Sequence, residues 1–235
     1  MTESVSLAAD AVTPSTGVAV LHLFCKPTPM FDGELVVAAV KAAEAAGVQV
    51  VTVSILGHKC DAAVMAVHQD MRQLRALQTA LQHGGLDVVD SYVSITEVSE
   101  YAKGMPEEML KPRLYPTIPP NHLDYPLPAW CFYPMSKKRE ADANWFMLPY
   151  EQRSEYMRDH GKSGRAFAGR IAQYITGSTG LDDYEWGVTL FGRYADDIKD
   201  VVYTMRFDQA SAVYADFGSF YMGMVTAVED LVLTL

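Results

Sequence analysis

The sequence contains few cysteines, few basic side chains and no long apolar run. Only three of its 235 residues are cysteines, Cys25, Cys60 and Cys131, and no two of them form a CxxC pair. This excludes a disulfide framework and is typical of a protein of the reducing cytoplasm. No apolar stretch approaches the ~20 residues that a membrane-spanning helix requires. The N-terminal residues also lack the pattern of a signal peptide, so we expect neither leader nor membrane span.

Acidic side chains outnumber basic ones. There are 29 Asp and Glu against 19 Lys and Arg, which gives a formal charge of −10. Such a surface repels phosphate backbones, so nucleic acid is excluded as a general partner, whereas a local basic pocket for a small anion is not. The hydrophobic content of 49% is that of a globular protein with a sizeable core. These features together predict a soluble cytoplasmic protein.

The first half of the chain alternates between strand and helix patterns. Residues 1–17 are rich in Ser, Thr and Ala and predict a flexible tail. β-Branched apolar runs predict strands, and Asp32 and Gly47 bracket an Ala-rich helix. The expected elements are a strand at 18–25, a helix at 33–46, strands at 48–56 and 62–68, a helix at 71–82 and a strand at 87–98. This β-α-β-β-α-β order is that of a ferredoxin-like unit.

A similar order recurs in the second half. Its expected elements are a strand at 130–135, a helical region at 150–174, a strand at 184–191, a helix at 196–205 and a closing strand at 218–225. The predicted fold class is therefore α+β, with two consecutive ferredoxin-like units at 18–110 and 129–235. Seven prolines lie within 101–128, so we expect no regular structure there and assign 111–128 as the connection.

A cluster of cations follows the apolar strand that begins the second unit. Tyr133 is followed closely by Lys137, Lys138 and Arg139, in a chain whose net charge is strongly negative. A solvated strand end explains the cluster in the simplest way. A site for an anionic ligand also explains it, and Tyr133 would then act as hydrogen-bond donor, acid or one-electron donor. The pattern alone leaves these alternatives open.

His160 and Gly164 lie on one face of a predicted helix, at positions i and i+4. Glycine costs a helix interior about 1 kcal/mol, so glycines beside a histidine indicate close approach by something bulky. A flat macrocycle ligated through the imidazole would require such a bare surface. A surface histidine near a helix break is the alternative. The remaining histidines show no spacing typical of a zinc site.

The second half of the chain contains four long motifs: CFYPMSKKR (131–139), NWFMLPYEQR (144–153), YMRDHGKSGRAFAGRIAQYITGSTGLDDYEWGVTLF (156–191) and MRFDQASAVYADFGSF (205–220). These motifs strongly resemble the coproheme decarboxylase family of the chlorite-dismutase-like haem proteins. The resemblance implies paired ferredoxin-like units forming a dimeric α+β barrel, assembled as a homopentamer. The implied reaction uses hydrogen peroxide to remove two propionate carboxyl groups from iron coproporphyrin III. Haem b is the product, and the iron porphyrin is both substrate and redox cofactor.

The resemblance also implies roles for individual residues. His160 matches the proximal ligand of the iron, and Tyr133 matches the tyrosine whose radical takes a hydrogen atom from a propionate. Gln173 matches the distal-pocket glutamine, where chlorite-splitting members have an arginine. Some relatives use a histidine of the connection as distal base, which His122 would imitate, but the presence of Gln173 argues against this. The residues that match propionate-binding positions are Arg113, Lys137, Arg206 and Ser211.

Two other functions compete with the decarboxylase. The first is another haem enzyme, a peroxidase or a chlorite-degrading relative, which the glutamine at 173 and the cluster at Lys137 disfavour. The second is a non-catalytic haem carrier or sensor. A carrier has no need of Tyr133, whereas the decarboxylase requires it.

Overall fold

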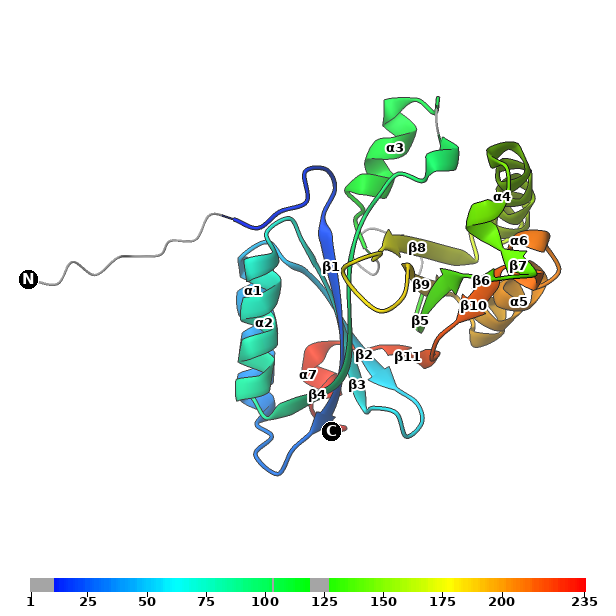
Figure 1. The fold of residues 1–235 in the computed structure, drawn as a ribbon. Helices are drawn as coiled ribbons and strands as arrows, with labels where there is room; N and C mark the ends of the chain where they lie inside the picture. The colour runs from blue at the N-terminus through cyan, green and yellow to red at the C-terminus, as the bar shows by residue number, and fades with distance from the viewer. Residues whose placement is uncertain (1–10, 103, 119–126) are drawn as a thin grey trace, which may run out of the picture.

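Apolar strands and aspartate-capped helices build the first unit in the computed structural model, which describes residues 11–102, 104–118 and 127–235 (Figure 1). Asp32 begins helix α1 by accepting hydrogen bonds from the backbone N–H groups of Glu34 and Leu35. Asp70 caps helix α2 in the same way. The elements are β1 (Ala19–Pro27), α1 (Gly33–Ala45), β2 (Gln49–Ile55), β3 (Ala62–His68), α2 (Met71–His83) and β4 (Leu86–Ile95).

The second unit repeats this order, with short elements inserted. Its main elements are β5 (Ala129–Lys137), α4 (Tyr150–Arg165), β8 (Ile171–Gly177), β9 (Trp186–Gly192), α5 (Ala195–Met205) and β11 (Tyr221–Val225). Between and after them lie β6 (Arg139–Glu140), β7 (Ala143–Asn144), α6 (Gln209–Ala212), β10 (Ala215–Phe217) and α7 (Val228–Leu231). A short 3₁₀ turn, Trp145–Met147, precedes α4. Two ferredoxin-like units are therefore confirmed.

The two units share one closed sheet. Its strand order is β10-β5-β11-β2-β3-β1-β4-β8-β9, and β9 pairs again with β5. Within each unit the fourth strand lies beside the first, then the third and the second, which is the ferredoxin-like arrangement. The last strand of each unit pairs with the second strand of the other, through β11–β2 and β4–β8. The two units of the single chain thus form one barrel, in which each unit takes the place of one subunit of a dimeric α+β barrel.

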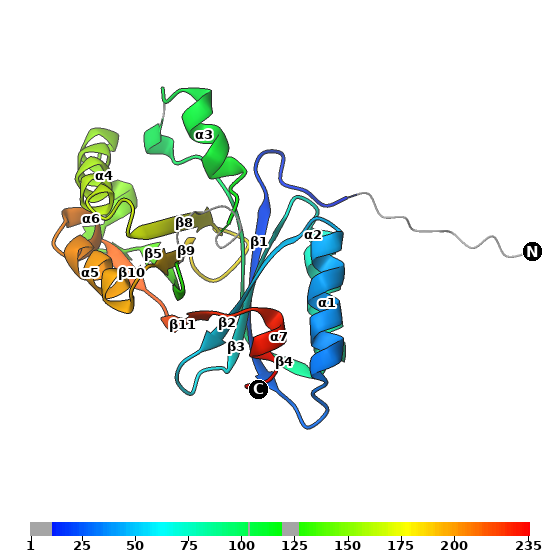
Figure 2. The same ribbon diagram turned by 180° about the vertical axis from the view of Figure 1, so that it is seen from behind.

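Three apolar clusters hold the barrel and its helices together. The first lies between the first sheet and helices α1 and α2, which cover its outer face (Figure 2). Leu74, Leu77 and Leu81 of α2 belong to it and share one helix face, each worth about 2 kcal/mol when buried. The second cluster fills the barrel, and the third lies between the second sheet and helix α5.

Two expectations from the sequence are wrong. The helical region expected at 150–174 ends at Arg165, and β8 begins at Ile171. Gly169 lies between them with φ of +81°, a conformation that ends a helix. The proline-rich segment is not without regular structure, because α3 (Glu107–Leu114) forms around Pro112 and spans the expected boundary at residue 111. In the part of the chain that the structure describes, no helix is both long and apolar enough to cross a membrane.

Candidate functional site

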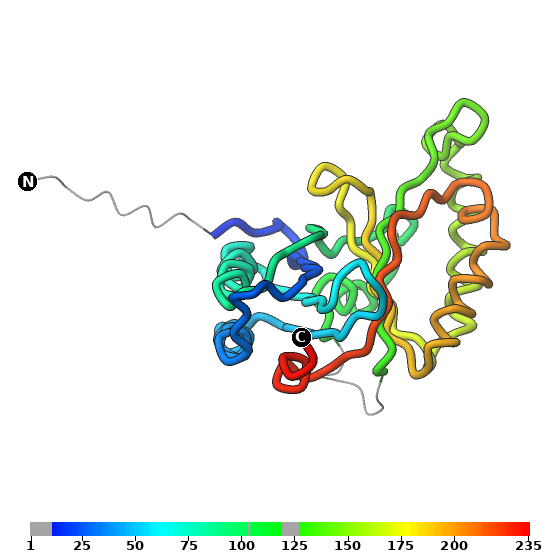
Figure 3. Tube along the Cα trace, turned by 90° about the horizontal axis from the view of Figure 1, so that it is seen from below, coloured from blue at the N-terminus to red at the C-terminus, as the bar shows by residue number. Residues whose placement is uncertain are grey.

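The candidate residues gather on the outer face of the second sheet, on the side where helices α4 and α5 lie (Figure 3). Strand alternation decides which side chains of β5 face these helices. Cys131 and Tyr133 join the cluster that contains Met205 of α5. Trp130 and Phe132 point the opposite way, into the barrel. The strand therefore presents its odd-numbered residues to the site.

His160 is held by a carboxylate that lies 48 residues further along the chain. Its Nδ1 lies 3.0 Å from Asp208 Oδ2 and 3.4 Å from Ser211 Oγ. Asp208 is the N-cap of α6, and its Oδ1 accepts a hydrogen bond of 3.0 Å from the Ser211 backbone N–H. A carboxylate that accepts from Nδ1–H fixes the imidazole in the tautomer whose Nε2 carries a lone pair. With 22% of its side chain exposed, His160 can therefore offer Nε2 to an electrophile or a metal ion.

Lys137 ends β5 as a buried ammonium group, only 8% exposed. Its Nζ donates to the Ala210 backbone oxygen and lies 4.4 Å from the centroid of the Trp145 ring. Burial lowers the pKa of Lys137 to about 8, and the negative charges of Asp208 and Glu185 oppose this shift. Lys137 therefore acts electrostatically on the carboxylate that holds His160.

Tyr133 is a buried phenol enclosed by two aromatic rings. The Phe220 ring is stacked on it at a centroid distance of 4.4 Å, and Phe217 meets it edge-on at 5.7 Å. Burial raises the pKa of Tyr133 far above its usual value, the charge of the Cys131 thiolate would raise it further, and the cation Arg206 opposes the shift. The phenol consequently keeps its proton at neutral pH, with an arginine close enough to influence it.

Helix α4 has a glycine one turn beyond His160, and the side chain of Met205 packs against it. A Cβ at Gly164 would lie 2.9 Å from Met205 Cε and 3.9 Å from Gln173 Oε1. The amide of Gln173, on β8, is thus directed toward the helix that carries His160. At Gly161 a Cβ would meet only the Arg165 guanidinium, at 3.3 Å. Met205 and Gln173 therefore occupy the space beside Gly164. The feature that fits an iron macrocycle is the available Nε2 of His160, because a porphyrin iron requires a single protein ligand.

A small cavity of about 260 Å³ is lined by Phe220, whose ring is stacked on Tyr133. Cys131, Phe220 and Arg206 line it, together with residues of α5: Ile198, Lys199, Val202 and Tyr203. Its walls are mainly apolar, and two cations stand among them. Such a lining suits a short apolar arm that ends in a carboxylate.

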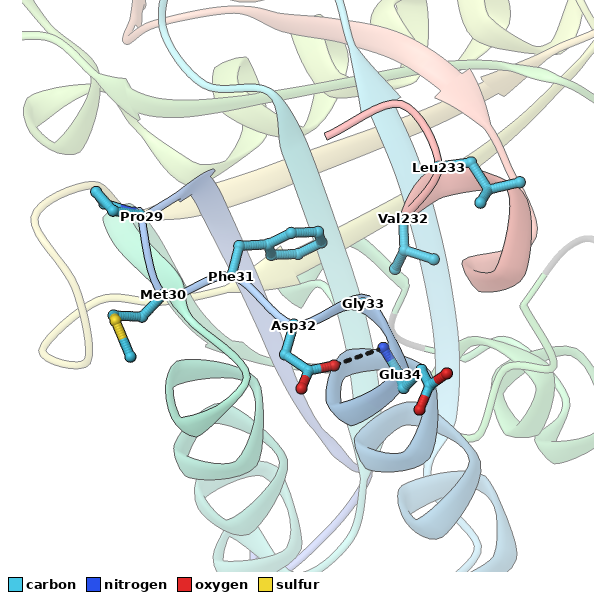
Figure 4. A pocket seen from close by; sticks show the side chains of 8 residues that line it. All are labelled: Pro29, Met30, Phe31, Asp32, Gly33, Glu34, Val232 and Leu233. Carbon is cyan, nitrogen blue, oxygen red and sulfur yellow. Dashed lines mark hydrogen bonds between the residues drawn. The ribbon is translucent and has the colours of Figure 1, made fainter.

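A larger groove of about 690 Å³ lies in the first unit and has no comparable chemistry (Figure 4). Met30 and Phe31 line one part of it, and Val232 and Leu233 line another. Its one capping carboxylate, Asp32, is already bonded to the start of α1. It contains none of the candidate residues, so we assign the site to the second unit.

Two of the sequence-predicted residues lie apart from this group. Arg113 is an exposed residue of α3, and the contact described for it is a weak one to Met105 Sδ at 3.8 Å. Figures 1 and 2 show α3 at a distance from α5 and α6. The structure therefore does not bring Arg113 to the other residues. His122 lies outside the described residues.

Sequence reasoning missed Asp208 and Met205. Asp208 stands three residues before Ser211 at the start of a short helix, a spacing typical of an N-cap, and this signal could have identified it. No sequence signal indicates that Met205 lies against Gly164. Among the described residues, no group of three or more His, Cys, Asp and Glu side chains could hold a metal ion. A single imidazole is what a porphyrin iron requires from the protein.

Comparisons with known proteins identify the family and the fold of the chain. The family model described as chlorite dismutase matches residues 33–226. The coproheme decarboxylase of Staphylococcus carnosus is 45% identical over 190 residues, which cover 76% of this chain and 73% of the relative. A haem-binding protein of Thermus thermophilus has a TM-score of 0.80 and 31% identity, over 95% of this chain and 98% of that one. A mutant chlorite dismutase of Candidatus Nitrospira defluvii shares the fold, with a TM-score of 0.73 at 16% identity over 94% of this chain and 96% of its own.

Proposed function

The chain belongs to the chlorite dismutase family, and from this premise we propose that it is a coproheme decarboxylase. It converts iron coproporphyrin III to haem b by oxidative decarboxylation of two propionates, with hydrogen peroxide as oxidant. The observation that carries the proposal is the placement of a carboxylate-held imidazole, His160, and a buried phenol, Tyr133, around the same segment. That segment runs from Met205 to Ser211. Met205 shares an apolar cluster with Tyr133, and the charge of Arg206 acts on the phenol. Asp208 and Ser211 lie against His160.

His160 holds the iron of the porphyrin through Nε2. Asp208 orients the imidazole by accepting a hydrogen bond from Nδ1–H, which leaves the lone pair on Nε2 for the iron. Lys137 lies behind this pair, bonded to the Ala210 oxygen, and we assign it to the support of Asp208. A direct contact of Lys137 with a propionate would require its ammonium to leave Ala210. The bound iron porphyrin supplies the redox chemistry with peroxide.

Tyr133 transfers the oxidising equivalent to the propionate. Because burial raises its pKa, the phenol is protonated at neutral pH and gives up its proton and electron together, as a hydrogen atom. The resulting tyrosyl radical regains a hydrogen atom from the propionate carbon chain. That chain then gives a second electron to the iron porphyrin that peroxide has oxidised, loses carbon dioxide and becomes a vinyl group, so that one peroxide is reduced to two waters for each propionate. Arg206 lines the cavity beside Tyr133 and binds the carboxylate of the reacting arm. Ser211 and Arg113 are assigned to the remaining propionates, Arg113 only if α3 approaches the ligand.

Gln173 distinguishes this site from one that splits chlorite. A neutral amide directed toward α4 donates a hydrogen bond but offers no cation to an oxyanion. Peroxide is neutral at physiological pH and needs no such cation. The amide therefore favours peroxide over chlorite.

We place the reaction in the cytoplasm, in a homopentamer. The three cysteines are free and buried, and burial raises the pKa of Cys25 and of Cys131 to about 12. Thiols of this kind are inert and agree with a reducing compartment.

The decisive experiment is to mix the purified protein with iron coproporphyrin III, add peroxide in steps and follow the mass of the pigment. Loss of carbon dioxide and two hydrogens at each of two propionates is the expected result. Tyr133→Phe should bind the pigment and yield almost no product, whereas a carrier would leave the pigment intact in both proteins. Full turnover by Tyr133→Phe would contradict the role of the phenol, and bleaching of the pigment without mass loss would indicate a peroxidase.

A further inference from the structure

The turn between β2 and β3 of the first unit reaches the second unit beside Tyr133. The Leu56 backbone N–H donates to the Met222 oxygen at 2.9 Å, and Ile55 pairs with Gly223 of β11. From the same turn, Lys59 Nζ donates to the backbone oxygen of Phe220. The lysine also lies 5.3 Å from the centroid of the Tyr221 ring. A residue of one unit therefore holds the backbone of the other just before β11 begins.

Phe220 is the ring that lies flat on Tyr133. Their centroids are 4.4 Å apart and their planes differ by 21°, so a rotation of either ring displaces the other. Phe220 belongs to no strand, because β10 ends at Phe217 and β11 begins at Tyr221. Its position consequently depends on contacts outside the sheet ladder.

Two contacts fix the ends of this connection. Near β10, the Gly218 backbone N–H donates to the Pro134 oxygen at 2.9 Å. A Cβ at Gly218 would lie 2.7 Å from Pro134 Cγ, so this end is tightly packed against the residue that follows Tyr133. At the other end, the backbone oxygen of Phe220 accepts from Lys59. The lysine is thus the side chain of the first unit that holds the carbonyl of Phe220, whose ring packs against Tyr133 and Phe217.

We propose that Lys59 is a positioning residue, which orients the Tyr133 phenol through the Phe220 ring. The inference rests on the proposed role of Tyr133 in the decarboxylation, and it assigns a part of the site to the first unit. Lys59 touches neither substrate nor reacting atoms. Its effect passes through one hydrogen bond and one ring stack.

Fluorine NMR of the protein labelled with 3-fluorotyrosine, without porphyrin, tests the orientation directly. Of the 13 tyrosines, Tyr133 is identified by the resonance that Tyr133→Phe removes. Lys59→Met should shift or broaden this resonance, and Lys59→Arg, which can still donate to the Phe220 oxygen, should restore it. Lys41→Met removes another exposed lysine, on α1, and should leave the resonance unchanged.

Turnover with iron coproporphyrin III gives the second readout. Lys59→Met should lower kcat by roughly tenfold with little change in KM, because a misplaced phenol affects the reaction more than binding. An unchanged Tyr133 resonance in Lys59→Met would overturn the proposal, as would identical effects of Met and Arg at this position. If the resonance moves as expected but the wild type forms no haem b, the positioning stands and the proposed function fails.

Discussion

Replacing Lys137 with methionine should change how the stability of the protein depends on pH. In the folded chain, burial lowers the pKa of this lysine from 10.5 to about 8. The unfolded chain therefore binds more protons than the folded chain between these two values. Stability rises with pH wherever this is so, which means that the wild type gains stability from Lys137 as pH increases through this range. Lys137→Met lacks the titrating group and should show no such gain.

The size of the effect follows from the two pKa values. A difference between 10.5 and about 8 corresponds to roughly 3 kcal/mol of cost for keeping the ammonium charged at neutral pH. Between about pH 7 and about pH 9.5, deprotonation of the folded chain relieves about 2 kcal/mol of this cost. Methionine at 137 loses the hydrogen bond to Ala210 and the contact with the Trp145 ring, each worth about 1 kcal/mol. These losses are present in the variant at both pH values and do not alter the comparison.

Urea unfolding of both proteins at the two pH values measures the effect. The free energy of unfolding of the wild type, relative to Lys137→Met, should increase by about 2 kcal/mol at the higher pH. Lys199→Met serves as control, because its exposed ammonium has a pKa raised by Asp200 and should give no increase of this sign. A constant difference between wild type and Lys137→Met would show that the ammonium is well solvated. It would also remove the reason for assigning Lys137 to Asp208 instead of a propionate.

Three further predictions concern the imidazole, the helix surface at Gly164 and the barrel interior. Asp208→Asn should release bound iron coproporphyrin III about tenfold faster, followed by transfer of the pigment to apomyoglobin; an unchanged rate would exclude Asp208 from orienting His160. Gly164→Leu should abolish the Soret change on titration with the porphyrin, with circular dichroism unchanged, and normal binding would show that this surface is not used. His22 is buried with a pKa lowered to about 3, so the wild type should lose about 2 kcal/mol relative to His22→Gln between about pH 8 and about pH 5. Urea unfolding at both pH values measures this, and equal losses in the two proteins would mean that water reaches the imidazole.

The first unit was predictable from sequence because its local signals agree with its tertiary structure. Asp32 and Asp70 are side-chain caps at the starts of α1 and α2, and both helices begin where these residues predict. Strands β1, β2 and β3 are apolar runs buried on both faces, covered by helices on one side and by the barrel interior on the other. Such runs are recognisable without knowledge of their partners.

Strand β8 was missed because its environment is decided by distant parts of the chain. Tyr174 packs on Phe191 inside the barrel, whereas Gln173 faces α4 outside it. Most of its side chains are only partly buried, so the strand lacks the clear alternation of one apolar and one polar face. The sequence prediction therefore extended the helix that begins at residue 150 into this strand, as far as residue 174. The residue pattern of this segment alone does not indicate that it pairs with β9 and β4.

Some features of the site can be predicted from the sequence, and others cannot. Tyr133 and Gln173 lie on strands, His160 lies on a helix, and the family motifs around them indicate their roles. What the sequence does not indicate is which charged groups meet one another. The pairing of His160 with Asp208 and the burial of Lys137 both depend on where α6 packs against α4 and β5. These contacts join residues 48 and 73 positions apart, beyond the reach of local spacing.

Closing two ferredoxin-like units into one barrel explains why only one of them carries the site. Both sheets turn their inner faces to the shared core, so chemistry is left to the outer faces, beneath the helices. In the first unit, α1 and α2 seal that face with leucines, valines and alanines. In the second unit, α4 has no buried residues, and no residue of α4 belongs to the apolar cluster of that sheet. The first unit still contributes across the β2–β11 pairing, which brings Lys59 to the backbone oxygen of Phe220, the residue whose ring lies on Tyr133.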